Sequence, residues 1–197
     1  MGQRCNGEGD KAEWRARLAR SRAKISVRQR VAEAHALGEA LVSMPVPDTV
    51  CCYVPFGSEP GSLALLEVLR DGGARVLLPV IPPEQGPLDW AEYTGTGTLV
   101  PGSLRGILEP SGTRLGTAAV GSAGLVLLPA LAVDHTGVRL GRGAGHYDRS
   151  LVYAADGAAL LAVVRDEELV ERLPAEAHDV RMTGALTPGR GLVRLPI

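Results

Sequence analysis

Short apolar runs that alternate with helix-forming segments are the feature that most restricts how this 197-residue chain can fold. Residues 49–54, 75–79, 125–128 and 159–164 are rich in Val, Leu, Ala and Cys. Short runs of this composition are typical of strands that are buried on both faces. Because helical patterns separate most of these runs, the sequence predicts a parallel sheet covered by helices on both sides, an α/β fold.

Helix signals fill the spaces between the runs. Ser26 is a good N-cap, and Gly72-Gly73 is a typical helix end. We therefore predict helices over 11–24, 27–43, 62–71, 146–155 and 167–173. Further strands are predicted over 88–93, 182–186 and 192–195, the last two as edge strands, and loops with short strands over 94–123.

The bulk composition is that of an ordinary globular protein, with 45% hydrophobic residues and a net charge of −1. Residues 1–10 are polar, lack the apolar stretch of a signal peptide, and are expected to be disordered. Residues 11–197 are expected to form one domain, a monomer in the cytoplasm with no membrane partner. Three cysteines form no disulfide or zinc pattern, and adjacent Cys51 and Cys52 are expected on opposite faces of a strand.

The basic charge is concentrated near the N-terminus. Residues 11–30 contain eight basic side chains and one acid, Glu13. A solvated helix face explains this pattern most simply, and an anionic small ligand is the alternative. A nucleic-acid partner is not expected, because the segment has one aromatic residue, Trp14, and no recognition motif.

A glycine-rich loop is the clearest functional signal. Gly141, Gly143 and Gly145 follow the apolar run 125–128 and precede the predicted helix at 146. Such a loop can point backbone N–H groups at an anion, and a helix N-terminus favours negative charge. Arginines and one carboxylate surround it, which suits a phosphate with a magnesium ion. The loop is neither a Walker A motif nor a good dinucleotide fingerprint, and a flexible turn remains the alternative.

The loop lies within Leu128–Arg149, a stretch that closely resembles the signature of the 5-formyltetrahydrofolate cyclo-ligase family. Shorter segments agree with the family in the same order along the chain. They are Lys11–Arg15, Tyr53–Glu59, Arg75–Pro79, Gly106–Pro110, His178-Asp179 and Leu186–Pro188.

This resemblance implies a three-layer α/β/α, Rossmann-like fold and an ATP- and magnesium-dependent enzyme. Members of the family close 5-formyltetrahydrofolate to 5,10-methenyltetrahydrofolate and release ADP and phosphate. Phosphorylation of the formyl oxygen creates a leaving group, and a neighbouring nitrogen then attacks the formyl carbon. The protein needs no nucleophile for this; it must align the substrates and neutralise charge.

The resemblance also assigns roles to residues. Arg142 is expected to stabilise the transferring phosphoryl group, and Asp148 to hold magnesium. Val54 and Glu59 are expected to bind the folate together with Arg142, Gly143, Ala144, Gly145 and His146. ATP is expected to contact Lys11, Arg15, Arg139, Leu140, Gly141, Arg142, Gly143, Ala144, Gly145, His146 and Tyr147.

Simpler roles remain open for several of these residues. Lys11 and Arg15 are alternatively surface charges, Glu59 an acid near a helix start, and Asp148 a first-turn helix residue. Tyr147 is alternatively a packing residue, and Asp134 is expected to serve a turn.

The chain departs from the family pattern at three positions. His146 replaces a Tyr, Ala144 stands where Gly or Lys is common, and Thr183 stands where a second magnesium carboxylate is expected. Asp179 or water is the substitute for that carboxylate. These departures keep two alternatives open: a paralogue that binds ATP or folate without efficient turnover, and another phosphate-handling enzyme on a related fold.

Overall fold

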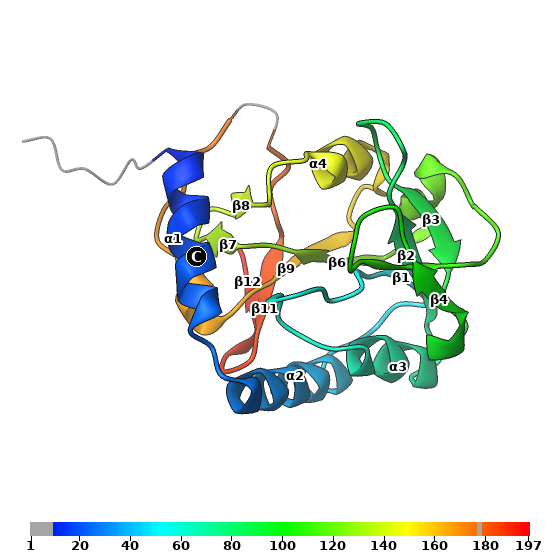
Figure 1. Cartoon of the computed structure of the whole chain (residues 1–197), viewed down its shortest axis with the longest axis horizontal. Coiled ribbons are helices and arrows are strands. Elements are labelled where there is room, and N and C mark those ends of the chain that lie inside the picture. Colours follow the sequence, from blue (N-terminus) through cyan, green and yellow to red (C-terminus); the bar gives the residue numbers. More distant parts are fainter. Residues whose placement is uncertain (1–9, 177–178) are drawn as a thin grey trace, which may run out of the picture.

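A seven-stranded sheet forms the centre of the molecule in a computed structural model that describes residues 10–176 and 179–197. Its strand order is β12-β11-β9-β6-β1-β2-β3 (Figure 1). Neighbours from β11 to β2 are parallel, whereas the edge strands β12 and β3 are antiparallel. The predicted mostly parallel sheet is therefore confirmed. Its members are β1 (Thr49–Cys51), β2 (Arg75–Val80), β3 (Asp89–Glu92), β6 (Leu125–Pro129), β9 (Ala159–Val163), β11 (Gly184–Thr187) and β12 (Gly191–Arg194).

The apolar composition of the strands follows from burial on both faces. Cys51 packs into the core on one face of the sheet, whereas Cys52 packs into the core on the other. Both side chains are nearly inaccessible, and burial raises the pKa of the Cys52 thiol to about 12. The two cysteines therefore act as small neutral hydrophobic residues, as predicted.

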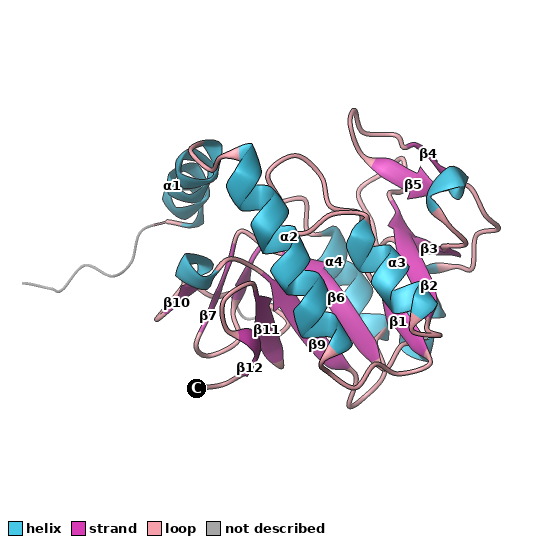
Figure 2. Ribbon diagram, turned by 90° about the horizontal axis from the view of Figure 1, so that it is seen from below, coloured by secondary structure: helices cyan, strands magenta, loops and turns pink. Residues whose placement is uncertain are grey.

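Helices cover the two faces in three layers. α2 (Val27–Val42) and α3 (Ala64–Asp71) cross one face (Figure 2). α4 (His146–Ser150) and the 3₁₀ segments η2 (Thr117–Ser122) and η3 (Leu151–Tyr153) lie on the opposite face. The Ser26 side chain accepts a hydrogen bond from the Gln29 N–H at 3.2 Å and caps α2, as predicted. None of the described helices is long and apolar enough to cross a membrane.

Two helix predictions are wrong in their extent. The helix predicted over 146–155 stops at Ser150, whose hydroxyl donates to the His146 carbonyl, and the chain tightens into η3. The helix predicted over 167–173 is only the 3₁₀ segment η4 (Asp166–Glu168), followed by strand β10 (Leu169–Val170). β10 is a strand because it pairs with β7 (Ala132–Asp134), a tertiary contact that local propensity does not show.

A small second sheet, which the sequence does not reveal, presents the glycine loop. It has the order β10-β7-β8, where β8 is Arg139–Leu140. Asp134 holds the β7–β8 turn: its Oδ1 accepts from the Thr136 N–H and hydroxyl and the Val138 N–H at 2.7–3.0 Å. Its Oδ2 accepts from the Leu173 N–H at 2.9 Å, so the predicted turn role of this aspartate is confirmed. The glycine loop therefore begins at the end of β8, a strand whose position is fixed by the hydrogen bonds of Asp134.

Helix α1 (Lys11–Ala23) packs beside this small sheet, with Leu18 buried against Leu131, Val138 and Leu140. On the other side of the molecule, strands β4 (Leu99–Pro101) and β5 (Leu108–Pro110) form a hairpin (Figure 1). Between β4 and β5, the Gly106 backbone has φ +84°, and a Cβ there would lie 2.8 Å from the Phe56 ring. This glycine lets the hairpin approach the loop that follows β1.

Candidate active site

The glycine loop joins β8 to α4 and needs glycine at its two positive-φ positions. Gly143 has φ +105° and Gly145 has φ +69°, conformations that cost other residues free energy. Gly145 is the N-cap of α4, so the loop ends at that N-terminus. The first amides of a helix have no acceptor within the helix, so this end of the loop presents N–H groups suited to an anion.

The loop borders a cleft of about 800 Å³ at the carboxyl ends of β1, β2 and β6. Ligands of parallel α/β sheets commonly bind at this edge. Every residue to which the sequence assigned an ATP, folate or magnesium role lines the cleft, except Thr183. The lining members of that set are Lys11, Arg15, Val54, Glu59, Arg139, Leu140, Gly141, Arg142, Gly143, Ala144, Gly145, His146, Tyr147 and Asp148.

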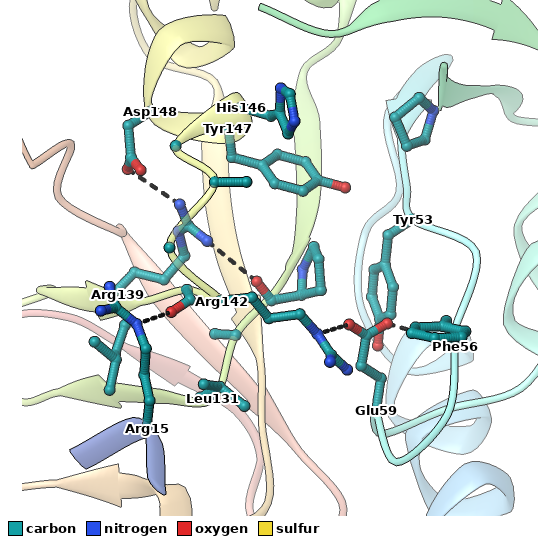
Figure 3. A pocket seen from close by; sticks show the side chains of 18 of the residues that line it. Arg15, Tyr53, Phe56, Glu59, Leu131, Arg139, Arg142, His146, Tyr147 and Asp148 are labelled. Atoms are coloured by element: carbon teal, nitrogen blue, oxygen red, sulfur yellow. Dashed lines mark hydrogen bonds and ion pairs between the residues drawn. The ribbon is translucent and has the colours of Figure 1, made fainter. Parts of the chain in front are cut away.

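Two arginines brace the loop side of the cleft. The buried Arg139 donates from Nη1 to the Pro129 carbonyl at 3.2 Å and from Nη2 to Asp148 Oδ1 at 3.0 Å (Figure 3). Arg15 of α1 donates from Nε to the Gly141 carbonyl at 2.9 Å. Both guanidinium groups therefore lie in the protein wall and fix the loop, while their charge makes that wall favourable for phosphate.

Lys11 lies at the mouth of the cleft among acidic groups. Its Nζ lies 3.1 Å from Asp179 Oδ2 and 3.4 Å from Glu176 Oε2. All three residues line the cleft. The structure thus brings Asp179, which the sequence marked only as a substitute, into the same cleft as Asp148.

Thr183 lies elsewhere. Its hydroxyl accepts from the Leu160 N–H at 2.8 Å and donates to the Leu160 carbonyl at 3.2 Å. These contacts place it just before β11, at the amino ends of the parallel strands, whereas the cleft lies at their carboxyl ends. Thr183 is therefore not among the described residues that line the cleft, whereas Asp179, four positions earlier in the sequence, is.

On the opposite side of the cleft, Glu59 faces the glycine loop. Its Oε1 accepts from Arg142 Nε at 3.0 Å, and its Oε2 accepts from the Phe56 N–H at 3.1 Å (Figure 3). The Arg142 guanidinium lies over the Phe56 ring, 5.4 Å from its centroid. Glu59 is nearly buried whereas half of the Arg142 side chain is exposed, with relative exposures of 9% and 50%. The two segments therefore meet in one crevice, and Arg142 is the more exposed partner.

The loop that follows β2 forms a third wall of the cleft. His146 Nδ1 donates to the Gly86 carbonyl at 2.8 Å, and Gln85 Nε2 donates to the Ala144 carbonyl at 3.2 Å. Beneath them, burial raises the pKa of Tyr147 well above its ordinary value, and the charge of Glu59 adds to the shift. Its phenol remains neutral and can serve as a hydrogen-bonding, apolar wall.

Sequence reasoning missed several lining residues. Phe56 and Tyr53 lie beside Glu59, and the β4–β5 hairpin contributes residues such as Leu104 and Ile107. Arg22 also lines the cleft, and the signal for it was present: it lies seven residues after Arg15, which places both on one face of α1. The hairpin carries no such signal, because its position depends on long-range packing.

Among the described residues, no three His, Cys, Asp or Glu side chains are grouped to hold a metal ion. Magnesium does not require such a cage, because it commonly binds one or two carboxylates together with phosphate oxygens and water. Asp148, partly exposed and in the cleft, fits that requirement.

Comparison with known proteins agrees with this geometry. The family model of the 5-formyltetrahydrofolate cyclo-ligase family matches residues 8–188. A 5-formyltetrahydrofolate cyclo-ligase of Mycolicibacterium smegmatis is 48% identical over 190 residues, which cover 94% of this chain and 97% of the relative. The enzyme of the same name from Escherichia coli K12 is 32% identical over 144 residues, 72% of this chain and 79% of the relative.

Solved structures show the same fold. The structure of Aquifex aeolicus 5,10-methenyltetrahydrofolate synthetase superposes with a TM-score of 0.79 at 25% identity, covering 95% of this chain and 93% of that one. A Mycoplasma pneumoniae 5,10-methenyltetrahydrofolate synthetase superposes with a TM-score of 0.70 at 17% identity, covering 88% of this chain and 96% of that one. The cleft, its glycine loop and the matched length lead to one conclusion: the chain belongs to the 5-formyltetrahydrofolate cyclo-ligase family.

Proposed function

We propose that this protein closes 5-formyltetrahydrofolate to 5,10-methenyltetrahydrofolate with consumption of ATP and release of ADP and phosphate. The observation that carries the proposal is the direct contact between Arg142 and Glu59. It brings an anion-binding loop and a buried carboxylate to opposite sides of one cleft. A phosphate donor and a pterin can therefore meet there.

The chemistry requires alignment more than a protein nucleophile. The formyl oxygen attacks the γ-phosphorus, and the bond from that phosphorus to the β–γ bridging oxygen breaks as ADP leaves. The neighbouring nitrogen of the folate then adds to the activated formyl carbon, and its proton and the phosphate are lost as the new C–N double bond forms. Holding the reacting atoms in line is the main contribution of such a site.

The loop side supports the nucleotide. Gly141 to Gly145 and the start of α4 offer backbone N–H groups, and Arg15 and Arg139 supply positive charge from fixed positions. Lys11 stands at the mouth, where the phosphate chain would enter. The remaining nucleotide contacts are assigned to Leu140, Arg142, Ala144, His146 and Tyr147, all in the cleft wall.

Asp148 would hold magnesium together with phosphate oxygens, and Asp179 is a further carboxylate that lines the cleft. When bound, the ion supplies neutralisation of the charge on the phosphates. The Arg139 contact to Asp148 Oδ1 fixes the orientation of that carboxylate.

The opposite side supports the folate. The edge of a reduced pterin presents a ring N–H and an amino group, and Glu59 is the acceptor that suits them. Val54 and Phe56 provide apolar surface beside it. Arg142 pairs with Glu59 across the cleft, so a pterin that uses Glu59 as its acceptor competes with this pair. Arg142 is then free to turn toward the transferring phosphoryl group, which would bind at the glycine loop that carries Arg142.

The test is direct. Methenyltetrahydrofolate absorbs in the near ultraviolet, so the purified protein with 5-formyltetrahydrofolate, ATP and magnesium should generate that absorbance at enzymatic rates. Omission of ATP should abolish it. Binding of both substrates without the absorbance would instead favour a non-catalytic carrier or regulator. Absence of folate binding would favour another phosphate-handling reaction.

A further inference from the structure

Arg22 is a buried guanidinium with one donor group that is not used. It is 1% exposed, yet it lines the cleft. Its Nε donates to Glu168 Oε1 at 2.6 Å, and its Nη2 donates to Glu168 Oε2 at 2.8 Å and to the Ala130 carbonyl at 2.6 Å. Its Nη1 has no hydrogen-bond partner among the described residues. Three contacts from Nε and Nη2 therefore fix the group, and the third nitrogen, Nη1, remains unpaired.

Arg165 provides an internal comparison. It is equally buried and also approaches Glu168, with Nη1 3.6 Å from Oε1, while its Nε donates to Glu33 at 2.8 Å. It lies outside the set of described residues that line the cleft. The two arginines and the two glutamates balance one another in charge. Arg165 Nη2 also has no hydrogen-bond partner among the described residues, but of these four residues only Arg22 lines the cleft.

Arg22 also lies near the folate side. Tyr53, buried in the cleft wall, donates its hydroxyl to the Pro60 carbonyl. Its pKa is raised by burial and by the charge of Glu59, and it is lowered by the charge of Arg22. Contacts link the two groups as well: Glu168, the partner of Arg22, lies 3.6 Å from Arg165 Nη1, which donates to the carbonyl of Ser58 beside Glu59. The wall thus presents an acceptor, Glu59, and a donor, Arg22.

We propose that Arg22 determines specificity for the 4-oxo group of the pterin, to which its Nη1 donates a hydrogen bond. The inference rests on the proposed folate site. A 2-amino-4-oxo pterin presents two donors and then an acceptor along one edge. Glu59 accepts from the first two, and Arg22 donates to the third. A 2,4-diamino ring presents an amino donor at that last position, which would face the guanidinium, and its N3 carries no hydrogen for Glu59. The part of the preference that Arg22 supplies is therefore the part that changes when Arg22 is replaced.

The experiment measures binding of two small fluorescent heterocycles, 2-amino-4-oxopteridine and 2,4-diaminopteridine, to the full-length protein by fluorescence titration. The unaltered protein should bind the 4-oxo compound at least about tenfold more tightly. Arg22→Lys loses the planar fork and should reduce this ratio to about threefold or less. The matched variant Arg165→Lys disturbs the same buried cluster and should retain the ratio of the unaltered protein.

A second pair of variants controls for the possibility that an Arg22 variant does not fold. Arg22→Met with Glu168→Gln removes both charges of the pair together, which avoids an unpaired buried charge. Glu168→Gln alone keeps Arg22 and an acceptor for it. The double variant should reduce the 4-oxo preference to about threefold or less, and the single variant, once circular dichroism shows that it is folded, should retain it.

The outcomes separate this inference from the proposed function. Equal ratios in the Arg22 and Arg165 variants, or no preference in the unaltered protein, would overturn the role of Arg22. A retained 4-oxo preference that depends on Arg22, without formation of methenyltetrahydrofolate, would support this role and overturn only the catalytic proposal.

Discussion

The two sides of the cleft are built in different ways. The loop side consists of peptide groups between Gly141 and the start of α4, braced by arginines that contact backbone carbonyls. The folate side depends on individual side chains, chiefly Glu59 and its neighbours Phe56 and Tyr53. A site made of backbone is damaged by added atoms, whereas a site made of side chains is damaged by lost ones. The two sides should therefore fail in distinguishable ways.

The largest effect is expected at Asp148. Asp148→Asn keeps an oxygen acceptor for Arg139 but removes the charge that would hold magnesium. We expect kcat to fall by about a hundredfold or more, with the melting temperature nearly unchanged. A magnesium titration of turnover, with the exposed Asp156→Asn as control, measures this. Activity equal to that of the control would remove Asp148 from the mechanism.

A smaller loss, specific to the nucleotide, is expected from Gly143→Ala. The φ of +105° strains any other residue, and the new Cβ would lie 3.5 Å from Arg15. We expect the KM for ATP to rise about tenfold while the KM for folate changes little.

Gly157→Ala is the matched control for this substitution. Gly157 has φ +87° and open space around its Cβ position. Gly157→Ala should lower the melting temperature about as much as Gly143→Ala does, with no change in the KM for ATP or in the KM for folate. A matching rise in the KM for ATP would show that backbone strain alone, rather than the loop's ligand contacts, is responsible.

The opposite pattern is expected from Glu59→Gln. The amide loses the charge and one acceptor, so the KM for 5-formyltetrahydrofolate should rise about tenfold, in line with one charged hydrogen bond lost. The KM for ATP should change by less than about twofold. Steady-state kinetics with each substrate varied in turn checks this, and equal changes in both constants would contradict the division of the cleft into two sides.

The smallest effect is expected at Thr183. Thr183→Val removes two hydrogen bonds to Leu160, so the melting temperature should fall by a few degrees. The magnesium concentration that gives half-maximal activity should stay the same, because the hydroxyl lies at the other end of the strands. A clear shift in that concentration would restore Thr183 to the metal site.

Much of this fold could be predicted from the sequence, because the apolar runs that became β1, β2, β6 and β9 have no other way to bury both faces. The family resemblance assigned both Glu59 and Arg142 to the folate, and the structure does bring their side chains into contact. The small sheet of β7, β8 and β10 did not, because its strands are two or three residues long and form through pairing with distant chain. The same reason explains why the helix predicted over 167–173 was wrong.

Site prediction failed where residue spacing carries no three-dimensional information. Thr183 and Asp179 are four residues apart, and only the direction of the chain into β11 shows that Asp179 reaches the cleft. Hairpin residues such as Leu104 reach the cleft because the hairpin approaches the Phe56 ring at Gly106, a long-range contact. Arg22 could have been found from helical periodicity alone.

The central claim is that both substrates meet across the Arg142–Glu59 pair, and calorimetry of folate binding tests it most directly. 5-Formyltetrahydrofolate is titrated into the protein with and without magnesium and a non-hydrolysable ATP analogue. The account predicts that the nucleotide tightens folate binding at least about fivefold, because it draws Arg142 away from Glu59, and that Arg142→Ala abolishes this coupling. Folate affinity that does not change with nucleotide in the unaltered protein would contradict it.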